Sequence, residues 1–444
     1  MSVSILLSLV LASIVLIVLL TSKLKYNIFL SMFVISLLLG ITALPVKDVV
    51  PIITEGFGGT MKSIGVIIVL GIMIGLLLEK TGATMSMASA ILRLTGKERA
   101  GLSIGITGYV TGIPIFCDSG FIVMSGLNKS LVQRTGKPMI YMATLLAAGL
   151  YSVHCLIPPH PGAMAAAGLL NTNIGHLILL GMAVAVPCSA AGFAWAHFMC
   201  RNVAHSPAQS PPDETEPVAE RALPSAFRSF LPIIVPLALL TTKSAVLLKL
   251  PASKGLFVST IRLLGCPEVA LLIGVGLAVT LFKTINVRLV NELFDKAIEK
   301  AGPILVLTGA GGIFGAVIKA TGVGVHAGTL LASTGLGLCI PFVIAAFLKT
   351  ALGSSTVAIM TAASIIAPML AALHLESETG RLLATLAMGS GSMIVSHAND
   401  SYFWVVTKFS GLDMGQTLRV YTSTTFVMGL AAFLTVLLCS LFLL

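Results

Sequence analysis

The sequence contains very few charged residues. Only 10% of its 444 residues are Asp, Glu, Lys or Arg, compared with roughly 25% in soluble globular proteins. Aromatic residues are also scarce, at 6%, whereas hydrophobic residues make up 56% of the chain. So few charges cannot cover a water-facing surface, and this excludes a soluble globular protein.

Long uncharged runs take the place of the missing charges. A helix needs roughly 20 apolar residues to cross a bilayer, and the longest uncharged run, residues 138–200, exceeds that length several times. The other runs are 1–22, 26–46, 63–78, 101–117, 301–318, 320–348, 350–375, 382–399 and 420–444. Allowing for breaks, we predict an all-α polytopic membrane protein with about ten to twelve transmembrane helices.

The positive net charge of +10 does not point to nucleic acid. Basic residues such as Lys23, Lys129 and Lys283 lie in short segments beside the apolar runs, as in cytoplasmic loops. The chain has no His-Glu-x-x-His, no Cys-x-x-Cys and no phosphate-binding Gly-x-x-x-x-Gly-Lys-Ser/Thr. We therefore expect the lipid bilayer as partner, no metal, no cofactor and no enzymatic activity.

A polar segment at 201–227, rich in proline and acidic residues, divides the chain into membrane halves 1–200 and 228–444. A pattern in the first half, Gly71-(x3)-Gly75-(x5)-Thr81-Gly82, recurs 240 residues later from Gly311 to Gly322. The common spacing favours a duplication. We expect two structural repeats, inverted with respect to each other in the membrane.

Four apolar segments are interrupted, at 111–120, 149–162, 353–356 and 389–401. In each, Gly or Pro stops a helix, and small hydroxyl residues begin or flank the next one. Unwound backbone is tolerated at membrane depth only where it is buried in protein or lines a cavity. Helix N-termini bind anions, because their N–H groups are unpaired and their dipole end is positive. The segments predict re-entrant or broken helical hairpins with paired anion-binding turns, typical of a carboxylate transporter.

Ionisable residues in these segments are the first site candidates. Asp118 is the only acid in 101–127, and a charge at that depth costs about 2.5–3.5 kcal/mol unless it faces a cavity or a partner. It is a candidate for picking up and releasing a proton, and it could also cap the helix that follows. His154 and His160 flank a Pro-Pro pair and are candidate proton relays, or else hydrogen-bonded packing residues.

A second polar cluster lies at the last interruption. His397, Asn399 and Asp400 could line the site, since amide and carboxylate groups bond the hydroxyls of a polyol acid. Tyr402 and Trp404 follow directly. We interpret both aromatic side chains as anchors at the lipid interface.

The motifs of these segments resemble the gluconate permease (GntP) family of bacterial sugar-acid:proton symporters, within the ion-transporter superfamily. The matching stretches are Phe116–Phe121, His154–Gly162, Gly353–Ala358 and Gly389–Trp404. The resemblance implies an inner-membrane, homodimeric permease for gluconate or a related hydroxy acid. It also implies a scaffold and a moving, elevator-type transport domain with two helical hairpins. Other members of the family handle D-serine, idonate, fructuronate or short aldonates.

We therefore predict a symporter that takes up a proton with a small hydroxylated carboxylate. The carboxylate is expected at Ser354, Ser355, Thr356, Ser390 and Ser392. Substrate hydroxyls are expected at His160, Asn399 and Asp400, and the coupled proton at Asp118, His154 and His397. The alternatives are a sodium-coupled symporter with Asn399 in the cation cage, a passive channel, and a membrane hydrolase built on Asp118 and the histidines.

Overall fold

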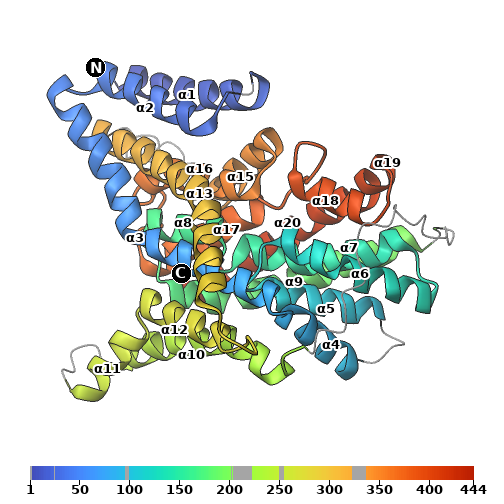
Figure 1. Ribbon diagram of the computed structural model, residues 1–444. Coiled ribbons are helices and arrows are strands. Elements are labelled where there is room, and N and C mark those ends of the chain that lie inside the picture. Colours follow the sequence, from blue (N-terminus) through green and yellow to red (C-terminus); the bar gives the residue numbers. More distant parts are fainter. Residues whose placement is uncertain are drawn as a thin grey trace.

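The structure is a computed structural model that describes residues 3–24, 26–95, 100–201, 203, 223–249, 255–322 and 337–444. Most of the polar segment expected at 201–227 lies outside these residues. The described part is helical throughout, with no β-strand (Figure 1). The helices of the first half are α1 Val3–Val18, α2 Ile28–Ala43, α3 Val46–Lys80, α4 Ala83–Thr95, α5 Ala100–Gly112, α6 Cys117–Thr135, α7 Met139–Leu156, α8 Pro161–Leu170 and α9 Ile174–Cys200.

The second half adds a similar series of helices. They are α10 Ala226–Lys249, α11 Leu256–Leu264, α12 Pro267–Val279, α13 Val287–Thr321, α15 Cys339–Leu352, α16 Ser355–Ile366, α17 Glu378–Gly391, α18 Ser401–Phe409, α19 Met414–Thr417 and α20 Ser423–Leu443. Short π-helical turns at Leu19–Lys23 and Leu418–Thr422 and a 3-10 turn at Ala367–Met369 complete the described elements.

Several of the helices suit a membrane. Within the described residues, six spans are long and apolar enough to cross a bilayer, and seven if the bent pair α11–α12 is one span. Shorter apolar helices at 28–43, 339–352 and 355–369 add to them. These features make the chain a multi-pass membrane protein, while ten to twelve crossings stay a prediction.

The four predicted interruptions are all present as helix breaks. They separate α5 from α6, α7 from α8, α15 from α16 and α17 from α18. Local chemistry explains where the helices stop and start. Pro161 occupies the first turn of α8, where its missing N–H costs nothing. Gly353 ends α15 with a φ of +84°, a conformation that glycine adopts without steric cost.

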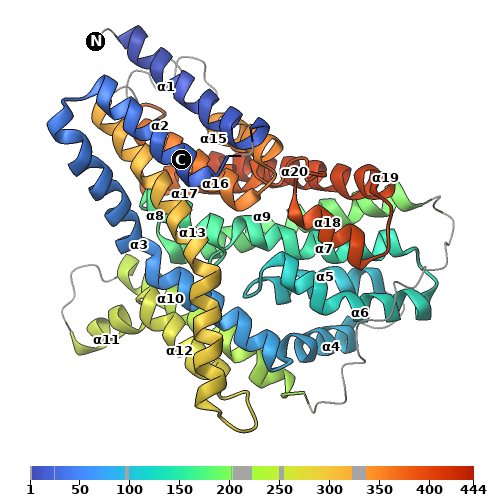
Figure 2. The same cartoon turned by 45° about the horizontal axis from the view of Figure 1, so that its top comes forward.

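Two 35-residue helices, α3 and α13, form the longest packed pair of the molecule. Figures 1 and 2 show them beside each other, with α1 and α2 at one end and α10–α12 at the other. Their backbones approach closely at small residues. A Cβ added at Gly56 would lie 2.7 Å from the backbone oxygen of Gly312, the kind of close contact that glycine permits between membrane helices.

The helix boundaries recur along the chain at the spacing of the glycine pattern. Helices α8 and α18 begin at residues 161 and 401, and α9 and α19 begin at 174 and 414, in both cases 240 residues apart. The long helices α3 and α13 begin at 46 and 287. Each break in the first half thus has a counterpart at nearly the same offset in the second.

Candidate functional site

Four helix N-termini meet at one pocket of about 280 Å³. Its lining takes residues 116–118 at the start of α6, Pro161 of α8, residues 354–357 at the start of α16 and residues 400–402 at the start of α18. Tyr151 and His154 of α7 and a short stretch of α13 complete the wall. The first turn of a helix carries N–H groups that have no partner within the helix, together with the positive end of the helix dipole. The pocket is therefore built to attract an anion.

The start of α16 supplies three of the six hydroxyl side chains that line this pocket. Ser354 caps the helix, its Oγ accepting from the N–H of Val357 at 3.4 Å. The Ser355 hydroxyl lies 2.7 Å from the hydroxyl of Tyr151. Thr356 Oγ1 lies 3.5 Å from Nε2 of His154. The structure thus brings three of the five hydroxyl residues predicted for carboxylate binding to the same wall as a predicted proton-coupling histidine.

Asp118 lies in the first turn of α6, and its side chain lines the pocket. The N-cap of this helix is Phe116, with no side-chain capping bond, so a capping role does not account for Asp118. Its Oδ1 and the Nδ1 of His154 are both buried without a hydrogen-bond partner. Buried polar atoms are nearly always paired, and two unpaired ones on residues that line one cavity point to a proton, water or ligand there.

Asp400 lies at the N-cap of α18 and is held from three sides. Its Oδ1 accepts from the N–H of Tyr402 at 3.0 Å, and its Oδ2 accepts from Lys349 Nζ and from Ser396 Oγ, each at 2.5 Å. The Lys349 side chain is 0% exposed and that of Asp400 is 5% exposed. Together they form a buried ion pair at the edge of the pocket.

Sequence reasoning missed Lys349. The signal was present, because this lysine is the single charge between the uncharged runs 320–348 and 350–375. A charge in that position must be paired or must reach water. In the sequence Lys349 marked only the boundary between two apolar runs, although a lone charge in such a position is itself a site candidate.

His160 lies directly behind the pocket rather than in its lining. Its ring centroid is 4.8 Å from that of His154, and its Nε2 is 2.8 Å from the carbonyl oxygen of Gly112. As the N-cap residue of α8, it ties the start of that helix to the end of α5. It is placed to support His154 rather than to meet a ligand in this conformation.

Four further predicted residues do not line this pocket. Ser390 donates to Leu386 O at 2.8 Å and Ser392 to Gly389 O at 2.7 Å, so both hydroxyls bond their own helix. Asn399 donates to Thr350 O at 2.9 Å, and His397 Nε2 lies 3.3 Å from the same oxygen. The turn that directs Asp400 inward leaves its neighbour Asn399 exposed.

The two aromatic residues after Asp400 have different environments. Tyr402 is 2% exposed, and its hydroxyl donates to Ala147 O at 3.3 Å. Its ring packs 5.5 Å from the ring of Tyr151. The interpretation of Tyr402 as a lipid-interface anchor was therefore wrong, because its side chain points into the site. Trp404 is 37% exposed, as an interface anchor would be.

Comparison with known proteins identifies the family. The model of the GntP family permeases matches residues 5–442, nearly the whole chain. The chain belongs to the GntP permease family. The predicted resemblance is confirmed, and the permease is a transporter rather than an enzyme, which removes the hydrolase alternative.

Relatives and a solved structure agree with this assignment. A gluconate permease of Pseudomonas aeruginosa is 31% identical over 438 residues, covering 97% of the permease and 96% of the relative. The D-serine transporter DsdX of Escherichia coli is 28% identical over 434 residues, covering 96% of each. The solved structure of Neisseria gonorrhoeae MtrF, described as an antimetabolite efflux pump, has the same fold. Its TM-score is 0.66 at 14% identity, over 94% of the permease and 96% of MtrF.

Proposed function

We propose that this permease is a secondary transporter that takes up a small hydroxylated monocarboxylate, such as gluconate, together with a proton. One observation carries the proposal: four helix N-termini converge on a pocket that also contains an acid with an unpaired oxygen. The pocket volume of about 280 Å³ is close to the lower end of the usual range for small-molecule sites, about 300–1,000 Å³. A solute the size of a sugar acid suits it.

The substrate carboxylate belongs at the start of α16. Ser354, Ser355 and Thr356 present hydroxyls there, next to the N–H groups of the first turn. Asp400 accepts three hydrogen bonds and retains acceptor capacity for a substrate hydroxyl, because a carboxylate offers about four lone-pair sites. We assign no substrate contact to Ser390, Ser392, His397 or Asn399, whose side chains bond backbone oxygens elsewhere.

A charge count supports proton coupling. With Asp118 and Asp400 both ionised and Lys349 protonated, the pocket and its edge carry one net negative charge. A monocarboxylate would add a second negative charge in a poorly hydrated space, which is unfavourable. A proton on Asp118 removes that conflict, so proton and substrate each favour the binding of the other. His154, in the same lining, gives the proton a second position.

The unpaired Asp118 oxygen also favours a second candidate substrate class within the same transporter function. An ionised Asp118 would pair with the ammonium of a small amino acid while the α16 turn holds its carboxylate. The D-serine transporter among the relatives makes this chemistry worth testing. Sodium coupling is the alternative to proton coupling, since hydroxyls and freed carbonyls can also hold a cation.

Alternating access is proposed from two cavities at opposite ends of α16. The pocket above lies at its N-terminus, and a second cavity of about 760 Å³ lies at its C-terminus, near Ser364 and Pro368. Between them Thr308 of α13 donates to Met360 Sδ at 2.7 Å. We propose that this contact forms part of the barrier between the pocket and the second cavity.

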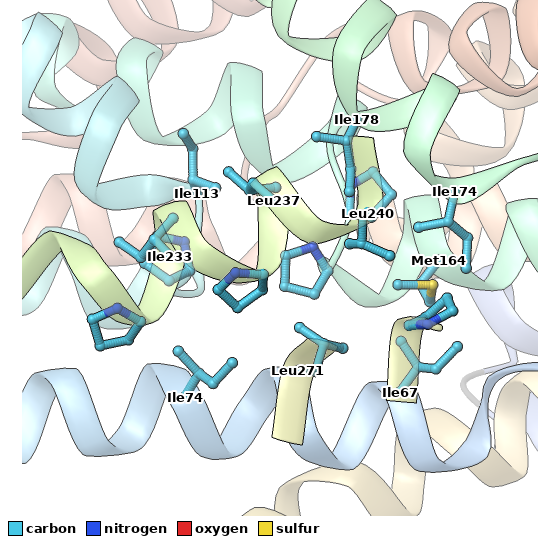
Figure 3. A pocket seen from close by; sticks show the side chains of 16 residues that line it. Ile67, Ile74, Ile113, Met164, Ile174, Ile178, Ile233, Leu237, Leu240 and Leu271 are labelled. Atoms are coloured by element: carbon cyan, nitrogen blue, oxygen red, sulfur yellow. The ribbon is translucent and has the colours of Figure 1, made fainter. Parts of the chain in front are cut away.

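We infer an elevator-type movement of the broken hairpins against a scaffold built around α3, α10 and α12. Figure 3 shows the wall between these parts: Ile67 and Ile74 of α3, Leu237 and Leu240 of α10 and Leu271 of α12 face Ile113, Met164, Ile174 and Ile178. Ile233 of α10 and six prolines complete this lining, and no polar group contributes to its surface. Such a wall lets the parts slide without breaking hydrogen bonds. The recurrence of helix boundaries at an offset of 240 supports two structural repeats in halves 1–200 and 228–444, and we propose that they are inverted with respect to each other.

The family resemblance supports a homodimer, and the bacterial relatives support location in the inner membrane. Purified permease reconstituted into vesicles tests the proposal. We expect labelled gluconate or a related aldonate to accumulate under an inward proton gradient and to be recovered chemically unchanged. Uptake that follows a sodium gradient and ignores pH would refute proton coupling, and equilibration without accumulation would indicate a channel. Competition by D-serine rather than by aldonates would favour the second substrate class.

A further inference from the structure

The ammonium group of Lys349 lies where two helix breaks cross. Its Nζ donates to the carbonyl oxygen of Gly353, at the break between α15 and α16, and to Asp400 Oδ2, at the break between α17 and α18. Ser396 donates to the same carboxylate oxygen at 2.5 Å. The Tyr151 ring covers the ammonium at 5.8 Å from its centroid. The lysine side chain is 0% exposed and that of Asp400 is 5% exposed, so the ion pair is buried.

These oxygens form the kind of site that holds a coupling cation. Unwound carbonyls and the negative C-terminal ends of half-helices are typical ligands of cations in broken-helix transporters. A buried carboxylate such as that of Asp400 also requires a positive partner, because an unpaired charge at this depth is costly. In this chain the positive partner is covalently attached, through a side chain that leaves the last turn of α15.

We propose that the Lys349 ammonium is a tethered cation that permanently occupies the oxygen cage of Gly353 and Asp400, so that no free sodium ion is needed there during transport. The inference rests on the proposed function and specifies its ion coupling. The lysine keeps Asp400 neutralised throughout the cycle, and Asp118 is left as the acid that exchanges a proton. Lys349 is thus a positioning residue that decides which ion the transporter uses.

The test removes the tethered cation and asks whether a free one takes its place. Lys349→Ala leaves a void beside an uncompensated carboxylate. Lys349→Met fills the void with an uncharged chain of similar length, and Lys349→Ala with Asp400→Asn removes the carboxylate as well. The thermal unfolding midpoint of each purified full-length variant is measured in choline chloride, sodium chloride and ethylammonium chloride at equal ionic strength.

We expect the wild-type midpoint to be the same in all three salts. The Lys349→Ala midpoint should rise by a few degrees in ethylammonium or sodium, because a cation that binds only the folded state stabilises it. The Lys349→Met and double variants should not respond. Recovery of folded Lys349→Ala only when ethylammonium or sodium is present would support the inference in the same way.

Three outcomes would overturn the inference. They are a Lys349→Ala variant that is indifferent to all three salts or lost in all of them, an equal response of the Lys349→Met or double variant, and a wild-type midpoint that depends on sodium. None of these measurements requires transport. A failure of gluconate uptake would therefore count against the proposed function and would leave the cation inference to be judged by the unfolding data.

Discussion

The buried pair of Lys349 and Asp400 makes a sharp prediction about stability. Both side chains are buried, at 0% and 5% exposure. Removing one partner of such a pair leaves an uncompensated buried charge, at a cost of about 3–5 kcal/mol. We therefore expect Lys349→Met and Asp400→Asn each to lower the free energy of unfolding by about that amount. Asparagine caps a helix about as well as aspartate, so Asp400→Asn tests the charge and spares the cap of α18.

The double variant that combines Lys349→Met with Asp400→Asn should lose far less stability than the sum of the two single losses. Replacing both charges by neutral groups of similar volume is often close to neutral, so the two effects should be non-additive by about 3 kcal/mol or more. Unfolding in mixed detergent micelles, followed for the wild type, both single variants and the double variant, gives this coupling energy directly. Additive losses in the double variant would refute a buried ion pair at this place.

The chain offers a matched control for this cycle. Arg288 and Glu292 form an ion pair one turn apart on α13, with side chains 89% and 55% exposed. Exposed pairs of this kind contribute about 0.3–0.5 kcal/mol. The cycle of Arg288→Gln and Glu292→Gln should therefore give a coupling energy near that value, well below that of the buried pair. Equal coupling in the two cycles would show that burial does not set the difference.

Three further predictions follow from the site and its packing. Asp118→Asn should abolish proton-driven accumulation while preserving substrate exchange across vesicles, and full accumulation by this variant would remove Asp118 from coupling. Ser354→Ala removes the N-cap of α16 and should lower both substrate affinity and, by ~1 kcal/mol, stability. Ser377→Ala removes the corresponding N-cap of α17. It should cost a similar ~1 kcal/mol of stability but leave affinity unchanged in binding assays. Gly56→Ala should destabilise the fold, because its Cβ would lie 2.7 Å from a backbone oxygen of α13. Gly58→Ala, with nothing within 4 Å, should unfold like the wild type, and equal losses would contradict the close packing of α3 and α13.

The site was partly predictable because broken motifs leave a local trace. Asp118 and Ser354–Thr356 stood out as polar residues beside Gly and Pro in apolar runs, and the structure places all four on one pocket. The direction of each side chain was not predictable. Asn399 and Asp400 are adjacent, yet one is exposed and the other lines the pocket. In an irregular turn no periodicity tells which residue faces inward.

Composition and run length alone determined that this is a multi-pass membrane protein with broken helices, since the scarcity of charge and the spacing of Gly and Pro act locally along the chain. The motifs also determined the family. Only the tertiary structure decided that four helix starts, distant in sequence, meet at one pocket, and that Lys349 reaches Asp400 across 51 residues of chain. Such contacts depend on how helices pack, and packing distances between distant residues leave no local pattern in a single sequence.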